Sequence, residues 1–310
     1  MINRRFFLLT GIVLAVLTVA TIGGSFYMLD YSLAPEPDRT DTAMYLRKQF
    51  ADYPETRPWV DSLRGCHALH DTMVTMPTGE HHHAYYINKG SRKTALVIHG
   101  WRDCAINFLF LARLYEHDLG YNVLMPELHA HGLSEGDLIQ MGLLDSDDVL
   151  HWLTMFKTDT MVVHGVSMGA ATTMMLSGKT MPKGIKDLRF VEDCGYTSVW
   201  DEFSGELKQQ FGLPPFPLMF TTSLLCKLRC GWSFGEASAL EGVRHCNYPM
   251  LFIHGSADDF VPTFMVHRLY DAKPTKKAIW IADGSAHAES YLNHKAEYTK
   301  QVKRFLNSVN

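Results

Sequence analysis

The stretch Met161-Val-Val-His-Gly-Val-Ser-Met-Gly-Ala-Ala-Thr-Thr-Met-Met-Leu176 decides the fold of this chain. Its first residues are apolar and partly β-branched, which predicts a strand, and its last residues predict a helix. Between them lies G-x-S-x-G, in which Ser167 stands between Gly165 and Gly169. In this setting the motif predicts a tight turn that exposes the serine hydroxyl, since the two glycines let chain segments approach closely. Ser167 is the predicted nucleophile.

Apolar runs of strand type recur on both sides of this turn and alternate with helical stretches. The runs are 95–98, 122–125, 161–163, 189–191, 250–253 and 278–281. This alternation indicates βαβ units and a mostly parallel sheet with helices on both faces. Runs at 70–76 and 83–88 are predicted as antiparallel edge strands, and the patterns at 40–66 and 290–308 as helices.

An acid and a base follow the serine in the order that its chemistry requires. A serine hydroxyl needs a general base, and the base needs a carboxylate that orients it. Asp258 lies in the loop after the run at 250–253, and His287 lies in a loop of small residues after the last run. The chain order serine, acid, histidine suits this type of turn, so Asp258 and His287 are the predicted acid and base. Asp259 and Asp193 remain alternatives for the acid.

Attack by the serine on a carbonyl creates a negative oxygen, which backbone N–H groups must stabilise. The N–H of Met168, the residue after the nucleophile, is one predicted donor. The N–H of Trp101, just past the strand run at 95–98, is the second. His99, beside it, is predicted to be a structural histidine.

The N-terminus has the features of a membrane anchor. Arg4 and Arg5 precede an uncharged stretch, 6–29, which as a helix would be about 36 Å long against a hydrocarbon core of about 30 Å. An uncleaved anchor is predicted; the alternatives are a signal peptide cleaved after Thr18-Val-Ala20 and a buried helix. Positive charge before the stretch and acidic residues after it favour a non-cytoplasmic body, periplasmic or extracellular, which would be secreted after cleavage.

The chain is accordingly divided into an anchor helix with its linker, 1–32, and one α/β domain, 33–310. Within that domain the alternation of strand and helix patterns stops between 197 and 248, and an insertion of this length is usually functional. Its apolar stretch from Leu213 to Leu225 predicts a small cap. Two roles remain open for these side chains, binding an acyl chain and packing against the domain.

Charge and cysteine content exclude several classes of function. With 29 Lys and Arg against 33 Asp and Glu, the formal net charge of -4 leaves no electrostatic footprint for nucleic acid. The six cysteines form no C-x-x-C and no zinc spacing, so no metal is expected. They are predicted to be free thiols, with pairing of Cys226 and Cys230, which share a helix face, left open.

Two further patterns resemble binding motifs but predict no ligand. Gly178-Lys-Thr180 echoes a phosphate loop, but Thr173 stands where the first glycine belongs, so a helix end capped by Gly178 is predicted. The run His81-His-His83 is predicted as a solvated edge, because consecutive strand residues point to alternate faces. No G-x-G-x-x-G follows an early strand, which argues against a dinucleotide-binding enzyme.

Residues 83–306 resemble the α/β-hydrolase superfamily, especially its serine-aminopeptidase-like and monoglyceride-lipase-like branch. The matching motifs are Val97-Ile-His-Gly-Trp101, Pro126-Glu-Leu-His-Ala-His-Gly-Leu-Ser-Glu-Gly136, His164-Gly-Val-Ser-Met-Gly169, His254-Gly-Ser-Ala-Asp-Asp-Phe-Val-Pro262 and Ser285-Ala-His287. A departure is Glu127-Leu-His129, where relatives often have Asp with a following Arg. The resemblance implies an α/β-hydrolase fold and a cofactor-free hydrolysis of an ester, thioester or amide through an acyl-enzyme.

Three functions follow as expectations. The first is a carboxylesterase or lipase acting on a small or lipid-like ester, which the apolar cap and the anchor favour. The second is a serine peptidase or an acyltransferase, which use the same parts. From a different class comes a non-catalytic, membrane-tethered binding module, against which the intact Ser167, Asp258 and His287 argue.

Overall fold

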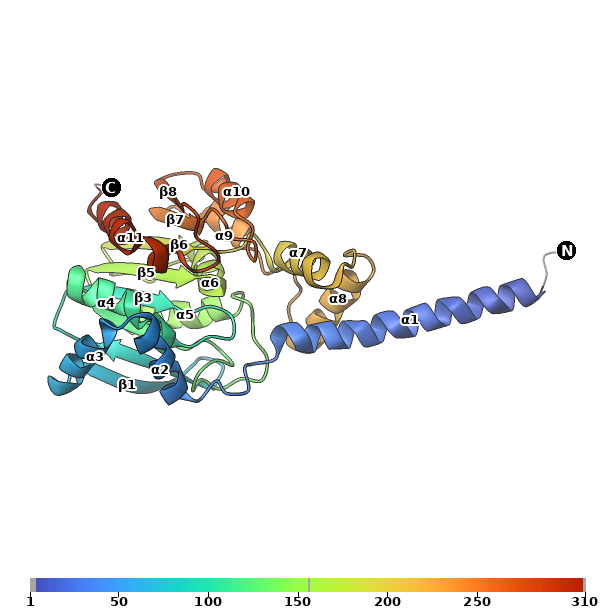
Figure 1. The fold of residues 1–310 in the computed structure, drawn as a ribbon, viewed down its shortest axis with the longest axis horizontal. Helices are drawn as coiled ribbons and strands as arrows, with labels where there is room; N and C mark the ends of the chain where they lie inside the picture. The colour runs from blue at the N-terminus through green and yellow to red at the C-terminus, as the bar shows by residue number, and fades with distance from the viewer. Residues whose placement is uncertain (1–3, 156, 309–310) are drawn as a thin grey trace.

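The computed structural model describes residues 4–155 and 157–308 as a layered α/β body from which one long helix extends (Figure 1). The described strands form a single sheet in the order β1-β2-β4-β3-β5-β6-β7-β8. Their bounds are β1 Leu69–Thr75, β2 His81–Ile87, β3 Lys93–Ile98, β4 Asn122–Pro126, β5 Thr160–Val166, β6 Asp187–Asp193, β7 Met250–Gly255 and β8 Lys277–Ala282.

Neighbouring strands from β4 through β8 pair in parallel, which confirms the predicted mostly parallel sheet. Strands β1 and β2 pair antiparallel, as predicted, but only β1 lies at the edge. β2 lies between β1 and β4, so its prediction as an edge strand was wrong.

Both faces of the sheet are covered because its central strands are apolar throughout. Every residue of β4 and β7 is buried. Along β3, Leu96 and Ile98 belong to one hydrophobic cluster and Ala95 and Val97 to the other, as the two-residue period of a strand requires. The first cluster includes residues of α5 (Asp145–Thr154), α6 (Met168–Ser177), α9 (Ala239–His245) and α10 (Phe264–Ala272). The second includes residues of α2 (Thr42–Asp52), α3 (Thr56–Gly65), α4 (Leu109–Arg113) and α11 (Ser290–Asn307).

The insertion after β6 forms a cap. Helices α7 (Val199–Phe211) and α8 (Leu218–Cys230) lie beside the sheet, next to the C-terminal part of α1 (Arg4–Leu33), as Figure 1 shows. Cap and α1 are joined by polar contacts: the hydroxyls of Ser25 and Thr221 lie 2.6 Å apart, and Arg229 pairs with Asp30 at 2.7 Å. After the cap, α9 returns to pack against α6.

Helix α1 is long and apolar enough to cross a membrane. Its segment Phe6–Leu33 has a mean hydropathy of 2.4, and its apolar side chains are largely exposed. Its C-terminal end is different, because Leu29 and Leu33 are fully buried in the first cluster. The division of the chain at residue 32 remains a proposal.

One detail differs from the sequence-based expectations: the histidine run is not a solvated edge, since only His81 is exposed, whereas His82 and His83 are buried. Gly178 is the C-cap of α6, as predicted, although its φ of -83° is not left-handed. A side chain would not fit there, because a Cβ would lie 2.9 Å from the Cα of Gly242 in α9. All six cysteines are free thiols.

Candidate active site

Ser167 occupies a strained turn between β5 and α6. Its φ of 57° and ψ of -120° lie in a region that non-glycine residues rarely adopt. The flanking glycines are required by space: a Cβ on Gly165 would lie 2.0 Å from the carbonyl oxygen of Gly169, and one on Gly169 would lie 2.3 Å from that of Ile98. The turn predicted from G-x-S-x-G is therefore present. The Ser167 N–H donates to the Asp193 carbonyl at 2.8 Å, which ties the turn to the end of β6.

The structure brings the three predicted catalytic side chains together. The Nε2 atom of His287 lies 2.8 Å from the Oγ atom of Ser167, and its Nδ1 atom lies 2.8 Å from Oδ2 of Asp258. The three residues follow β5, β7 and β8, whose carboxyl ends meet at one edge of a parallel sheet. An imidazole placed in this way can accept the hydroxyl proton while the carboxylate holds its other nitrogen.

The Asp258 carboxylate is held in its ionised form. Its Oδ1 atom accepts hydrogen bonds from the N–H groups of Phe260 and Val261, at 3.1 and 2.9 Å. Burial alone would raise the pKa of Asp258, but hydrogen bonding to His254 and His287 outweighs burial and lowers the pKa to about 2. His254 has its Nε2 atom 3.2 Å from Oδ2 of Asp258. No role for His254 follows from the sequence, although it begins the motif that contains Asp258.

The two alternative acids lie elsewhere. The Oδ2 atom of Asp193 accepts a hydrogen bond from the Tyr298 hydroxyl at 2.9 Å, and burial raises the pKa of Asp193 to about 6. Asp259 is exposed. Of the three carboxylates, Asp258 is the one with a hydrogen bond to His287 among the described residues.

Both predicted oxyanion donors border the same pocket as Ser167. Met168 begins α6, where backbone N–H groups lack partners within the helix and carry a partial positive charge. Trp101 lies opposite, after β3. The next residue, Arg102, donates its N–H to Nε2 of His131 at 3.1 Å. His99 is a buried structural histidine that contacts the backbone of Gly100 at 2.8 Å and of Leu128 at 3.0 Å.

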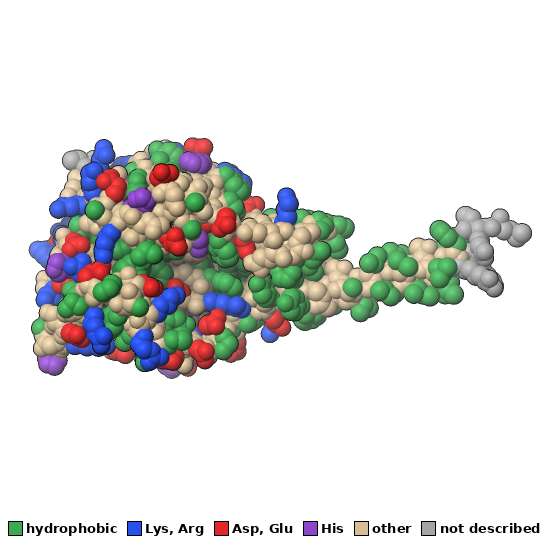
Figure 2. Space-filling model, viewed as in Figure 1, with side chains coloured by type: hydrophobic (Ala, Val, Ile, Leu, Met, Phe, Trp, Pro, Cys, Tyr) green, Lys and Arg blue, Asp and Glu red, His purple; other side chains and the backbone are tan. Residues whose placement is uncertain are grey.

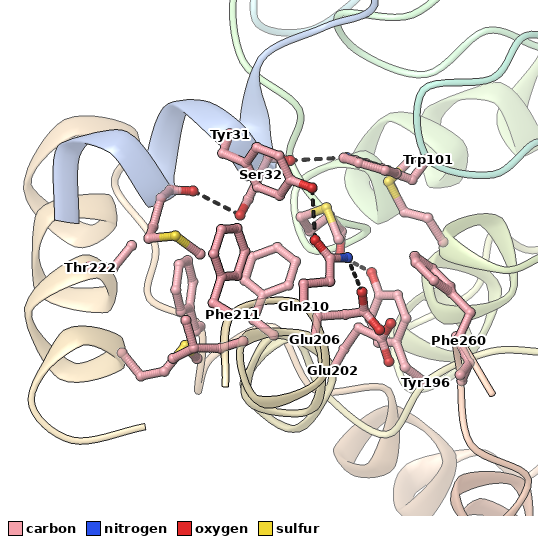
Figure 3. Close-up of a pocket in the computed structure, with 18 of the residues that line it drawn as sticks. Tyr31, Ser32, Trp101, Tyr196, Glu202, Glu206, Gln210, Phe211, Thr222 and Phe260 are labelled. Carbon is pink, nitrogen blue, oxygen red and sulfur yellow. Dashed lines mark hydrogen bonds between the residues drawn. The ribbon is translucent and has the colours of Figure 1, made fainter. Parts of the chain in front are cut away.

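The pocket beside Ser167 is lined mainly by apolar side chains. Figure 3 shows that its wall comes from the end of α1, from α7 and α8, and from the loops that carry Trp101 and Phe260. The end of α1 is fastened there, since the Trp101 Nε1–H donates to the Ser32 carbonyl at 2.9 Å and the Tyr31 hydroxyl donates to Gln210 at 2.8 Å. Sequence reasoning missed this wall because no local pattern indicates that the N-terminal helix returns to the site.

Two carboxylates from α7 interrupt the apolar wall. Glu202 is 4% exposed, and neither of its side-chain oxygens has a hydrogen-bond partner among the described residues. Burial, and then the negative charge of Glu206, raises the pKa of Glu202 well above its usual value. Glu206 accepts a hydrogen bond from Gln210 (Figure 3). Both residues line the pocket.

Relatives of this chain were found among curated proteins. A Bacillus subtilis protein described as uncharacterized, YqkD, is 32% identical over 222 residues, which make up 70% of this chain and 72% of YqkD. An uncharacterized membrane protein of Saccharomyces cerevisiae, YNL320W, is 26% identical over 196 residues, 61% of this chain and 62% of the yeast protein. No family model matches the chain.

Solved structures share the fold at low sequence identity. The Pyrococcus furiosus esterase Pf2001 has a TM-score of 0.61 at 20% identity, over 77% of this chain and 90% of the esterase. The α/β hydrolase GrgF from a Penicillium species has a TM-score of 0.58 at 13% identity, over 77% and 97% of the two chains. A membrane phospholipase A, described as a bacterial virulence factor, has a TM-score of 0.57 at 15% identity, over 98% of both chains. Because this likeness extends over most of each chain, the protein has the α/β-hydrolase fold. Its identity to YqkD over 70% of the chain shows that it belongs to the same family as that protein.

Proposed function

We propose that this protein is a serine hydrolase that cleaves a carboxylic ester through an acyl-enzyme formed on Ser167. The observation that carries the proposal is the continuous hydrogen-bonded arrangement from Ser167 through His287 to Asp258, with both contacts of His287 at 2.8 Å. Nucleophile, base and orienting acid thus have the mutual geometry that acyl transfer requires.

The reaction follows from this geometry. His287 takes the proton of the Ser167 hydroxyl as its oxygen attacks the ester carbonyl, and Asp258, with a pKa of about 2, stays ionised and stabilises the imidazolium. The N–H groups of Met168 and Trp101 donate to the oxyanion. The imidazolium then protonates the leaving alcohol, and the same base activates the water that hydrolyses the acyl-enzyme.

The character of the pocket supports an acyl chain as the part of the substrate that is bound. Met28, Leu207, Leu218 and Met219 reach it from α1, α7 and α8, so an alkyl chain would be buried among apolar side chains. Burial stabilises each methylene group by about 0.8 kcal/mol. Met219 also belongs to the first hydrophobic cluster, so the inner face of α8 would both bind the acyl chain and pack against the domain, the two roles that the sequence left open for the cap.

The outer face of α8 supports a bilayer as the source of this substrate. Phe220, Leu224 and Leu228 of α8 follow one another at four-residue intervals and are 55%, 60% and 77% exposed, and Phe216, just before the helix, is 72% exposed. Residues at this spacing share one helix face. Figure 2 shows apolar side chains along α1 and on the adjoining cap, whereas charged side chains are spread over the rest of this face of the body. We therefore propose that α1 anchors the protein, that the outer face of α8 rests in the lipid surface, and that the body lies on the non-cytoplasmic side.

The activities of two structural relatives agree with this proposal. Pf2001 is an esterase and the other a membrane phospholipase A. A lipid-like ester is accordingly the first substrate class to test.

The direct test is hydrolysis of p-nitrophenyl esters, from acetate to palmitate, by the full chain in detergent beside its Ser167→Ala variant. The full chain is needed because removing residues 1–32 would take away the buried Leu29 and part of the pocket wall. We expect the variant to lose at least about 10⁴-fold in kcat. The preferred chain length would measure the pocket, and equal turnover by both proteins would contradict the assignment of Ser167.

The acid is tested with a matched pair of variants. Asp258→Asn should lower kcat about 10⁴-fold, because the amide no longer stabilises the imidazolium. The neighbouring Asp259→Asn should leave kcat unchanged, because Asp259 is exposed. A large loss of kcat in Asp259→Asn but not in Asp258→Asn would mean that Asp259 is the catalytic acid. If a fluorophosphonate fails to label Ser167 and no ester is turned over, the non-catalytic binding module becomes the better proposal.

Glu202 favours a second candidate function, a peptidase. A buried carboxyl group without a partner in an acyl pocket can bind an ammonium group, such as the N-terminus of a peptide. The test compares aminoacyl p-nitroanilides with p-nitrophenyl esters, using Glu202→Gln. A loss confined to the aminoacyl substrates would support the peptidase, and turnover of esters alone would exclude it.

A further inference from the structure

Three potential metal ligands converge outside the active site, at the start of β2. They are Glu80, His82 and His129, whose ligand atoms all lie within 4.8 Å of one another. Oε2 of Glu80 is 3.2 Å from Nδ1 of His129 and 3.8 Å from Nε2 of His82. In a tetrahedral zinc site, ligand atoms bound at 2.0–2.1 Å stand about 3.3 Å apart. The three groups are therefore close to the spacing that one ion needs.

His82 is the observation that points to a ligand. Its side chain is fully buried, and neither ring nitrogen has a hydrogen-bond partner among the described residues. A buried imidazole without partners is costly, since one nitrogen is a donor and the other an acceptor. A cation at Nε2 would satisfy that nitrogen's lone pair. Oδ2 of Asp148 lies 3.6 Å from Nδ1, where metal-bound histidines usually have an orienting carboxylate.

The fold explains how these residues meet. Glu80 and His82 are two positions apart, so their side chains lie on the same side of the strand, away from that of His83. Pairing of β2 with β4 brings the residues that follow Pro126 alongside, as the hydrogen bond from the Glu127 N–H to the His83 carbonyl shows. The sequence does not indicate this cluster, because His129 comes from the loop after β4 and not from the histidine run itself.

A glycine keeps His129 in place. Gly136 has a φ of +126°, and a Cβ there would lie 2.4 Å from Nε2 of His129. The ring is therefore packed closely on that side, and its Nδ1 atom faces Glu80 at 3.2 Å.

We propose that Glu80, His82 and His129 bind one divalent transition-metal ion. Two imidazole nitrogens and one carboxylate form a donor set that suits zinc, whereas calcium and magnesium prefer oxygen ligands alone. Asp148 is a positioning residue for His82. The ion would link β2 to the loop after β4, outside the candidate active site.

Hydrogen bonds connect this site to the loop that carries Trp101, the proposed oxyanion donor. Nδ1 of His131 lies 2.8 Å from the His129 carbonyl, and its Nε2 accepts from the Arg102 N–H at 3.1 Å, one residue beyond Trp101. An ion on His129 would thus brace the loop that supports Trp101. This consequence depends on the proposed function, but metal binding itself does not.

The test is metal binding by the full chain in detergent, after removal of bound ions with a chelator. Zinc content is measured after equilibration, and the visible absorption of added Co²⁺ reports the coordination geometry. We expect one equivalent of metal per chain. His129→Gln and Glu80→Gln should weaken binding by about 100-fold or more, and Asp148→Asn by about 10-fold to 100-fold.

His81→Gln is the matched control, because His81 is the exposed neighbour in the same histidine run. It should retain one equivalent. Labelling of Ser167 by a fluorophosphonate checks that each variant is folded, and His129 and Glu80 decide the outcome if His82→Gln does not fold. The proposal is overturned if the wild-type chain binds no stoichiometric metal, if Glu80→Gln and His129→Gln bind as tightly as wild type, or if His81→Gln loses the ion equally.

Discussion

Two neighbouring carboxylates behave in opposite ways at the candidate active site. Asp258 receives hydrogen bonds from the backbone and contacts two histidines, and its pKa is lowered from 3.8 to about 2. Asp193 is buried with the Tyr298 hydroxyl as partner of one oxygen, and its pKa is raised from 3.8 to about 6. Hydrogen bonds and nearby positive charge favour the ionised form of an acid, and burial favours the neutral form. The balance of these effects decides which form each acid takes.

These shifts predict how stability depends on pH. The raised pKa of Asp193 favours folding below about pH 4, and this contribution, about 3 kcal/mol, is lost as the pH rises through about 6. The lowered pKa of Asp258 affects folding stability in a separate pH range. Its stabilising contribution is present above about pH 4 and is lost as the pH falls through about 2. Asp193→Asn should therefore gain stability relative to wild type between pH 4 and 7. Thermal unfolding at a series of pH values checks this, and a difference independent of pH would contradict it.

At the scale of single elements, the turn between β5 and α6 depends on glycine. Gly165→Ala places a methyl group 2.0 Å from a backbone oxygen that cannot move aside, so the free energy of unfolding should fall by about 3 kcal/mol or more. Gly205→Ala, in the exposed middle of α7 with nothing within 4 Å, should raise it by about 0.5–1 kcal/mol. Denaturant unfolding of both variants makes the comparison, and equal effects would show that the turn tolerates a side chain.

Helix α8 should serve two surfaces, the pocket and the lipid. Replacing Leu224 and Leu228 by Glu removes two exposed apolar side chains from its outer face without touching the pocket lining. Turnover of an ester presented in vesicles should fall at least about tenfold, while turnover of a soluble ester is retained. Leu292→Glu, at a 48% exposed position on α11, is the matched control and should change neither rate. An equal loss on both substrates would mean that the outer face acts through the pocket.

At the scale of the whole molecule, we propose two roles for α1, membrane anchoring and closure of the pocket. Its first part has the length and composition of a membrane span, and its last turns fill the core and close the pocket. We expect the full chain to resist carbonate extraction from membranes. Leu14→Lys combined with Leu17→Lys should release it, because each charge at the centre of a span costs about 2.5–3.5 kcal/mol. Phe264→Lys, at an exposed position on α10, is the control and should stay bound to the membrane. Release of the wild-type chain would contradict an anchor.

The elements and the three proposed catalytic residues could be predicted because their signals are local. Most strands and helices correspond to a short run of residues with its own pattern. Ser167 directly follows β5, and Asp258 and His287 lie in the loops after β7 and β8. A parallel sheet collects the carboxyl ends of its strands at one edge, so the order along the chain was enough to bring these three side chains together.

Other parts of the site were decided by the tertiary structure alone. Met28 and Ser32 line the pocket beside residues of α7 and α8, far away in the chain, and His82 meets His129 only because β2 pairs with β4. A glycine is needed at position 178 because Gly242 of α9 packs closely against it, and no sequence rule for helix ends indicates that contact. Periodicity along a chain reports which face of an element is apolar, but it carries no information about which distant element covers that face. That choice depends on packing of the whole body, which is why the sequence by itself determined the order of the catalytic residues along the strands and the tertiary structure determined the pocket around them.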